Sequence, residues 1–181
     1  MGRILRQPLA ALADICDGFF PDLAFVDSCV RLESDAIPQP ARRLLVHRDH
    51  MTVVLREHAA TELDLSVLQQ THEADEYARK ILLTTRTASP TVVEFGIVRM
   101  RLLDIPATAR SEIEAAREPL GDVLIRHNVM RRISPRWYFR FPADTPISQM
   151  FGKIETPTYG RLGTIFCNEE PAIDVLEVVG G

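Results

Sequence analysis

Between residues 52 and 102 the chain repeatedly shows the pattern of apolar and polar positions that is typical of β-strands. In LDLSVLQQ, for example, leucine and valine alternate with polar residues, the period of two expected when one face of a strand is buried. Because the connections between these stretches are short, we expect hairpins and therefore an antiparallel sheet. The predicted strands are TVVLREH (52–58), LDLSVLQQ (63–70), YARKILLTT (77–85) and VVEFGIVRMRL (92–102).

Helical and then further strand patterns follow. Proline near the start of PATARSEIEAAR (106–117) and of the stretch from Pro119 favours two helices, and ARRLLVH after the PQP break at 38–40 favours a short one. The later predicted strands are RWYFRF (136–141), TYGRLGTIFC (158–167) and PAIDVLEVV (171–179). This order predicts an α+β fold, with a single antiparallel β-sheet and helices on one face. We expect residues 37–181 to form this domain and residues 1–36 to be an N-terminal accessory segment packed on it.

Composition narrows the class of protein. The 181 residues suffice for one domain with a proper core, and 46% hydrophobic with 25% charged residues is ordinary for a globular protein. A net charge of −4 argues against nucleic acid as the main partner. The sequence shows no apolar run long enough for a bilayer and no clear signal peptide, so we expect a cytoplasmic protein without a membrane partner. Three cysteines, Cys16, Cys29 and Cys167, match no zinc spacing and predict reduced, inert thiols.

Two charged residues occupy positions where the strand pattern expects apolar ones. Arg79 shares a strand face with Tyr77, Ile81 and Leu83, and Glu177 shares one with Ile173, Val175 and Val179. A buried charge needs a counter-charge or a ligand. Arg79 and Glu177 could therefore pair with each other or with other protein groups. Alternatively, they could line a pocket in which arginine binds a carboxylate and a desolvated glutamate, with raised pKa, meets a ligand oxygen.

The helix that starts in PLGDVL is a third candidate element. Its first backbone N–H groups have no partner within the helix, and the helix dipole favours an anion there. Pro119–Gly121 could equally be only a turn between two helices.

Four stretches in order, MTVVL (51–55), ARKILL (78–83), EPLGDVL (118–124) and YGRLGTIFCNEEPAIDVLEVV (159–179), resemble the chorismate pyruvate-lyase (4-hydroxybenzoate synthase) family, in particular its diverged bacterial branch. The resemblance covers about residues 41 to 179. It implies an antiparallel sheet with helices on one side that encloses a small aromatic-acid site. The implied reaction removes the enolpyruvyl side chain of chorismate and yields 4-hydroxybenzoate and pyruvate, with no metal or organic cofactor.

The resemblance also implies roles for individual residues. The family's substrate-binding arginine corresponds to Arg79 and its functional glutamate to Glu177. Its backbone contact in the P-L-G turn corresponds to Leu120, beside Gly121, and its contact in the M-T pair to Met51, beside Thr52. Arg161 could pair with Glu177 or face the second carboxylate of the ligand. The roles of Arg126 and of His127 are left open.

The segment HRDHMT (47–52) first suggests a metal site, because His47 and His50 lie three residues apart beside an aspartate. A metal site needs a third ligand and groups that fix the imidazoles, and neither HExxH nor a paired CxxC occurs. We therefore expect no metal: HRDH should end the first helix, and Met51–Thr52 should enter the first strand and contribute backbone to the pocket wall.

Other functions remain open from the sequence. A non-catalytic binding module or sensor for a small aromatic carboxylic acid is one, since related folds serve as effector domains of regulators that sense small molecules. A structural protein in which Arg79 and Glu177 form only an ion pair is another. A cavity that encloses both side chains without direct contact between them would favour ligand chemistry. The sequence leaves the oligomeric state undetermined.

Overall fold

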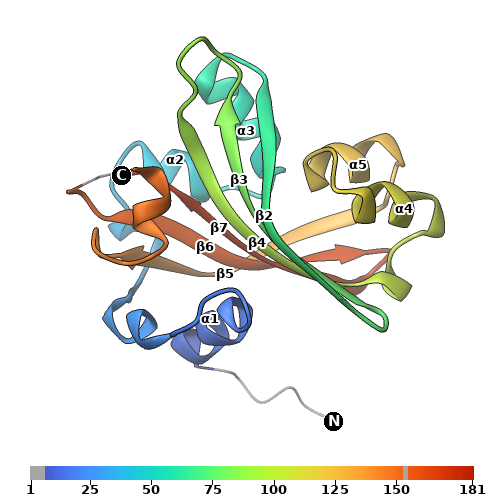
Figure 1. Ribbon diagram of the computed structural model, residues 1–181, viewed down its shortest axis with the longest axis horizontal. Coiled ribbons are helices and arrows are strands. Elements are labelled where there is room, and N and C mark those ends of the chain that lie inside the picture. The colour runs from blue at the N-terminus through green and yellow to red at the C-terminus, as the bar shows by residue number, and fades with distance from the viewer. Residues whose placement is uncertain (1–6, 153–154) are drawn as a thin grey trace.

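In the parts of the chain that the computed structural model describes, residues 7–152 and 155–181, seven strands form one sheet in the order β1-β5-β6-β7-β4-β3-β2. Every neighbouring pair is antiparallel. Figure 1 shows the strong twist of this sheet. The strands are β1 (Val30–Leu32), β2 (Leu63–Glu73), β3 (Glu76–Thr85), β4 (Val92–Arg101), β5 (Arg131–Phe141), β6 (Thr158–Cys167) and β7 (Glu170–Val179).

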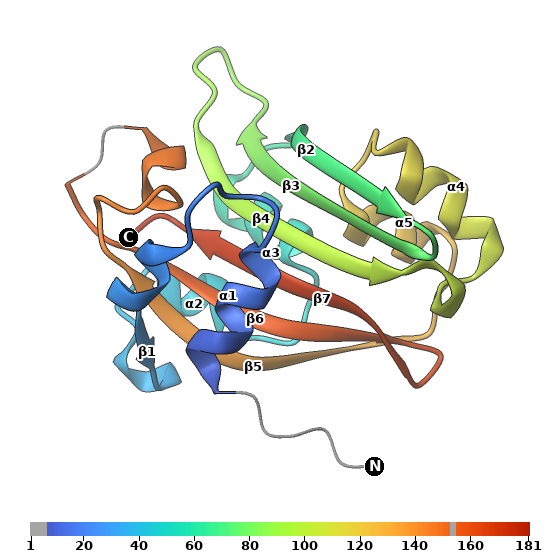
Figure 2. The same ribbon diagram turned by 60° about the horizontal axis from the view of Figure 1, so that its bottom comes forward.

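The helices are distributed unequally over the two faces of the sheet. Apolar residues of α2 to α5 pack with one face, and α1 packs on the opposite face (Figure 2). The helices are α1 (Pro8–Cys16), α2 (Ala41–Leu45), α3 (Met51–Ala59), α4 (Ala107–Ala115) and α5 (Leu120–Arg126), with short 3₁₀ turns at Ala24–Ser28, Ser34–Ala36, Leu102–Asp104 and Ser148–Phe151. The predicted α+β class with one antiparallel sheet is confirmed, and the later strands and helices lie where the pattern placed them, except that β5 begins at Arg131 and not at residue 136.

The strand predicted for residues 52–58 is wrong, because this segment is the helix α3. Its buried residues, Met51, Thr52 and Leu55, have the spacing of one helix face. The helix begins after His50, whose backbone is extended, and ends at Ala60, which adopts a left-handed conformation. The prediction that HRDH ends the first helix is also wrong, since α2 stops at Leu45 and residues 46–50 link it to α3.

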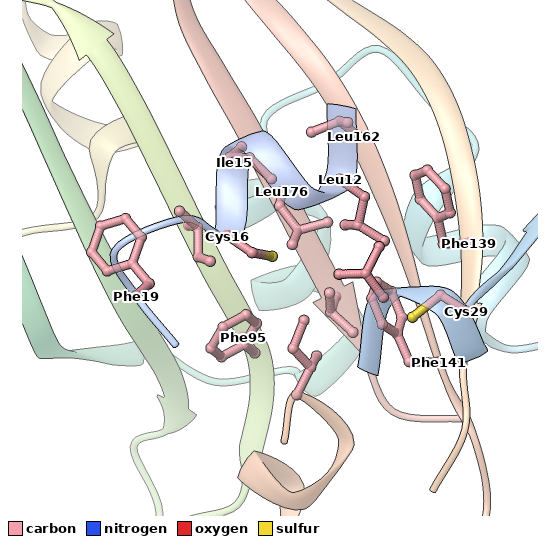
Figure 3. Packing of buried hydrophobic residues seen from close by; sticks show 14 of the residues in the cluster. Leu12, Ile15, Cys16, Phe19, Cys29, Phe95, Phe139, Phe141, Leu162 and Leu176 are labelled. Carbon is pink, nitrogen blue, oxygen red and sulfur yellow. The ribbon is translucent and has the colours of Figure 1, made fainter. Parts of the chain in front are cut away.

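The face under α1 carries a core of its own. Leu12, Ile15 and Cys16 of α1 contact residues such as Phe95 on β4 and Leu176 on β7 (Figure 3). β1 also belongs to the N-terminal segment and pairs with β5. Residues before position 37 therefore supply both an edge strand and the cover of one face of the sheet.

The three cysteines are free and buried, as the sequence predicted. Burial raises the pKa of Cys16 and of Cys29 to about 12 and that of Cys167 to about 11. Because the thiolate is the reactive form, these thiols are inert at neutral pH. Among the described residues, no helix is both long and apolar enough to cross a membrane.

Candidate functional site

A glycine in the middle of the helix-covered face forms the floor of the site. Gly96 of β4 lies between Glu177 of β7 and Ile81 of β3 in the cross-strand register, and Glu177 is in turn opposite Arg161 of β6. Arg79 and Glu94 lie one step to either side of this row, on the same face. A cavity of about 50 Å³ lies there, with Arg79, Glu94, Gly96 and Glu177 on its wall. Side chains from the strands and from the helices above them thus surround the space that Gly96, which has no side chain, leaves open.

Arg79 is buried without an anionic partner. It is 2% exposed, and its guanidinium donates only long hydrogen bonds, of 3.5 Å to the carbonyl of Ile113 and 3.4 Å to that of Glu118. Its Nε has no hydrogen-bond partner, and no ion pair to Arg79 occurs among the described residues. Burial lowers the pKa of this guanidinium, which the neighbouring Tyr77 partly offsets. An uncompensated buried cation is costly, so a bound anion would stabilise it.

Glu177 points to the same cavity but is paired with a different arginine. Arg161 Nε donates to Glu177 Oε2 at 2.5 Å, and the two side chains are 1% and 14% exposed. The ion pair that the sequence left open as Arg79–Glu177 is therefore not formed. The cavity encloses both residues without direct contact between them, which is the arrangement that favours a ligand site over a purely structural ion pair.

Arg161 lies behind Glu177 and is not on the cavity wall. Its Nη1 donates to the carbonyls of Leu45 and His47 at 3.1 and 3.0 Å, and Nη2 donates to that of Asp49 at 3.4 Å. The guanidinium thus fixes both Glu177 and the linker between α2 and α3. The contact of Arg161 with a ligand, expected as one possibility from the sequence, becomes a positioning role in this geometry.

Glu94 is a second acidic group on the cavity wall, and it is not among the site residues predicted from the sequence. It is 5% exposed. Burial and then the neighbouring Glu177 raise its pKa well above the ordinary range, while Arg161 lowers it. The physical signal was available in VVEFGIV, because Glu94 alternates onto the same strand face as Gly96 and Val98. Like Arg79 and Glu177, Glu94 is a charged residue at a strand position where the pattern expects an apolar one.

α3 and α5 cover the cavity. Met51 and Thr52 of α3 and Leu120 and Gly121 of α5, the positions at or beside the substrate contacts implied by the resemblance, all line it. Arg56 and Asp122 tie the two helices together by two hydrogen bonds of 2.7 and 2.6 Å. The first residues of both helices therefore cover the site. Met51 and Thr52 belong to a helix and not to the predicted strand.

His50 lies between this cavity and a wider surface groove. It lines both, and the groove, of about 800 Å³, also includes Arg48, Arg131 and Arg132. Nε of Arg131 donates to Nε2 of His50, which requires a neutral imidazole. Burial, and next the charge of Arg131, lower the pKa of His50 to about 4. Its ring packs over the start of α5, since a Cβ at Gly121 would lie 3.2 Å from Nδ1.

The remaining candidate residues have structural partners. His47 bonds the carbonyl of Leu44 at 2.6 Å and lies beside Arg161. Arg126 pairs with Glu112 and Glu118, and His127 lies 3.0 Å from Glu112. No cluster of three or more potential metal ligands occurs among residues 7–152 and 155–181.

Comparison with known proteins gives a likeness of structure. No family model and no curated protein matches the chain. The crystal structure of PhnF from Mycobacterium smegmatis is similar, with a TM-score of 0.56 and 11% sequence identity over 75% of this chain and 65% of that one. The likeness shows the fold alone. This fold is the chorismate-lyase-like α+β arrangement, and the chain spans less than two thirds of the length of PhnF.

Proposed function

We propose that this protein is a cofactor-independent carbon–oxygen lyase that cleaves the enolpyruvyl ether of chorismate to 4-hydroxybenzoate and pyruvate. The observation that carries the proposal is Arg79, a buried guanidinium without a carboxylate partner, in a cavity that it shares with Glu177. The resemblance of the sequence to the lyase family names these two residues independently of their burial. Planar, two-pronged recognition of a carboxylate is the function for which arginine is best suited.

Each residue then has a defined task. Arg79, with the backbone N–H of Leu120, holds the ring carboxylate. Glu177 lies beside the C4 oxygen, where its orientation is fixed by Arg161. Cleavage makes the ring aromatic, which supplies the driving force, so the protein has only to orient the dianion, stabilise charge as the ether bond breaks and exclude water. The apolar walls from Ile81, Leu83 and Val175 suit a ring and keep water out.

The cavity is too small for the substrate as it stands. Its volume of about 50 Å³ is below the range of about 300–1,000 Å³ typical of ligand pockets. Binding therefore has to move α3 and α5 apart, and the Arg56–Asp122 pair that joins them is the contact that would yield. Because Arg56 is about one quarter exposed, this pair can exchange its partners for water.

The deciding experiment is incubation of purified protein with chorismate, with 4-hydroxybenzoate and pyruvate measured by chromatography. We expect both products in equal amounts, and loss of turnover in Arg79→Ala and Arg79→Lys, because lysine keeps the charge but loses the planar fork. Arg86→Ala is the matched control, since this arginine follows β3 and pairs only at the surface with Asp64.

Other results would redirect the assignment. Tight binding of 4-hydroxybenzoate without turnover would make the protein a binding module or sensor for an aromatic carboxylic acid. Neither turnover nor binding, with Arg79→Ala impairing only stability, would leave a structural role for the buried charges.

A further inference from the structure

The cavity holds two carboxyl groups in unequal surroundings. Glu177 accepts a hydrogen bond from Arg161 Nε at 2.5 Å and forms an ion pair with this arginine. Glu94 is more deeply buried, at 5% exposed against 14% for the side chain of Glu177, and forms no ion pair among the described residues. Two neighbouring carboxyl groups in an apolar cavity cannot both ionise at low cost, so the one without a cation keeps its proton.

The charged groups around Glu94 come from β7, β6, β3 and the start of α3. Across β7 lies Glu177 and behind it Arg161, whose donors are occupied by Glu177 and three backbone carbonyls. From β3 the cavity receives Arg79, which lies on the other side of Gly96. His50 at the start of α3 is neutral, because it accepts a hydrogen bond from Arg131. Arg161 is thus engaged elsewhere and the unpaired Arg79 lies beyond Gly96, so neither cation forms an ion pair with Glu94 among the described residues.

The position of Glu94 gives that proton access to a ligand. Oε1 of Glu94 lies 3.4 Å from the point where a Cβ at Gly96 would be, so the carboxyl borders the empty floor of the cavity. Arg79 and Glu94 flank this floor from opposite sides, and Glu177 borders it from a third. A ring whose carboxylate contacts Arg79 would place its far end, where the oxygens are, between the two carboxyl groups.

We propose that Glu94 is the acid of this site and that Glu177 is its base, an assignment that rests on the proposed lyase function. Glu177 accepts the proton from C4, and the electrons of that C–H bond form the new ring double bond. The C3–O bond breaks toward the oxygen, which takes the proton of Glu94. Enolpyruvate leaves and tautomerises to pyruvate without net change in protons. Transfer of the proton from Glu177 to the adjacent Glu94 restores the starting state.

Glu94→Gln tests this assignment, because glutamine keeps the size and a hydrogen-bond donor but cannot transfer a proton. We expect kcat to fall by about 10²- to 10⁴-fold, the usual contribution of a general acid, while 4-hydroxybenzoate binds within about 3-fold of wild type. Glu94→Asp should recover part of the rate. Glu170→Gln, at an exposed position of the same strand as Glu177, is the control and should leave kcat unchanged.

The pH profile separates an acid from a merely structural residue. Wild-type kcat should decline on the alkaline side as Glu94 loses its proton, and this limb should be absent from the residual rate of Glu94→Gln. A wild-type rate in Glu94→Gln, or an alkaline limb that persists in it, would overturn the assignment.

The two proposals fail in different ways. If wild-type protein does not cleave chorismate, the lyase function is wrong regardless of Glu94. An infrared difference spectrum between wild type and Glu94→Gln then still decides whether Glu94 is protonated at neutral pH, through the carbonyl stretch of a carboxylic acid. Absence of this band would contradict the acid role of Glu94, even in an active enzyme.

Discussion

At the scale of single residues, Gly96 determines how much space the site has. A Cβ at this position would lie 3.1 Å from Cδ1 of Ile81 and 3.4 Å from Oε1 of Glu94. We predict that Gly96→Ala weakens 4-hydroxybenzoate binding at least 10-fold, since the methyl group occupies the cavity floor. Stability should change by only about 1 kcal/mol, because the crowding of Ile81 is partly offset by reduced freedom of the unfolded chain. Titration calorimetry and denaturant unfolding measure the two effects.

The double variant Gly96→Ala with Ile81→Val is the control for this prediction. Valine lacks Cδ1, so the closest contact of the new methyl group disappears, and of the crowding by Ile81 only the contact with Cγ1 at 3.2 Å remains. Binding should remain weak, because the methyl group still fills the floor. If the double variant binds like wild type, the cavity over Gly96 is not the ligand site.

The direction of a side chain can be predicted from the sequence where a single strand determines it. Alternation alone predicted that Arg79 and Glu177 face inward, since side-chain direction follows from position in a strand. Alternation could not decide whether Arg161 pairs with Glu177 or faces the ligand, two options that the sequence left open, because that contact depends on which strands are neighbours. β6 and β7 are adjacent, whereas β4 separates β7 from β3. Glu94 was missed although its strand pattern gave the same signal as Arg79.

At the scale of elements, α3 shows how a local pattern can mislead. Val53 and Val54 are β-branched and favour a strand. The residue before Met51 is His50, which is not a typical helix N-cap, so the sequence gives no clear sign that a helix begins there. Packing decides otherwise, because Met51, Thr52 and Leu55 bury one helix face between the sheet and its neighbours. Tertiary contacts of this kind commonly override local propensity. The predicted contribution of Met51 and Thr52 to the pocket wall survives the change of element.

Arg161 connects the elements around the site, and its replacement tests that connection. We predict that Arg161→Lys lowers the free energy of unfolding by about 2 to 3 kcal/mol, since the ammonium cannot reproduce the hydrogen bonds to Glu177 and to three carbonyls. Amide exchange should accelerate in residues 46–51, which the guanidinium holds in place. Denaturant unfolding and hydrogen–deuterium exchange measure these changes.

Arg86→Lys is the matched control, because that arginine is 61% exposed and should change neither quantity. Faster exchange spread evenly over the whole sheet in Arg161→Lys, without a local maximum at the linker, would argue against the positioning role.

At the scale of the whole molecule, the two apolar faces of the sheet differ in what they contain. The face under α2 to α5 carries the cavity and its charges, and the face under α1 carries a continuous apolar core. The face under α2 to α5 could be predicted from the sequence, because Arg79 and Glu177 are charged residues among the apolar residues of that face. The opposite face contains Phe95 and Ile97 in β4, but their cover comes from the far N-terminal end of the chain. Strand patterns do not reveal such a distant partner.

This division predicts that the two faces can be perturbed separately. Leu12 of α1 is fully buried against the sheet, so Leu12→Ala should lower the free energy of unfolding by about 2 to 5 kcal/mol through lost burial and the cavity that remains. Leu103→Ala, at a residue 63% exposed, should cost little. Because the proposed ligand cavity lies on the other side of the sheet, the folded Leu12→Ala protein should bind 4-hydroxybenzoate with wild-type affinity. Denaturant unfolding and calorimetry on the same preparation provide both numbers. A large loss of affinity in protein that is demonstrably folded would mean that the core under α1 sets the geometry of the strands bearing Arg79, Glu94 and Glu177, and that the two faces act as one unit.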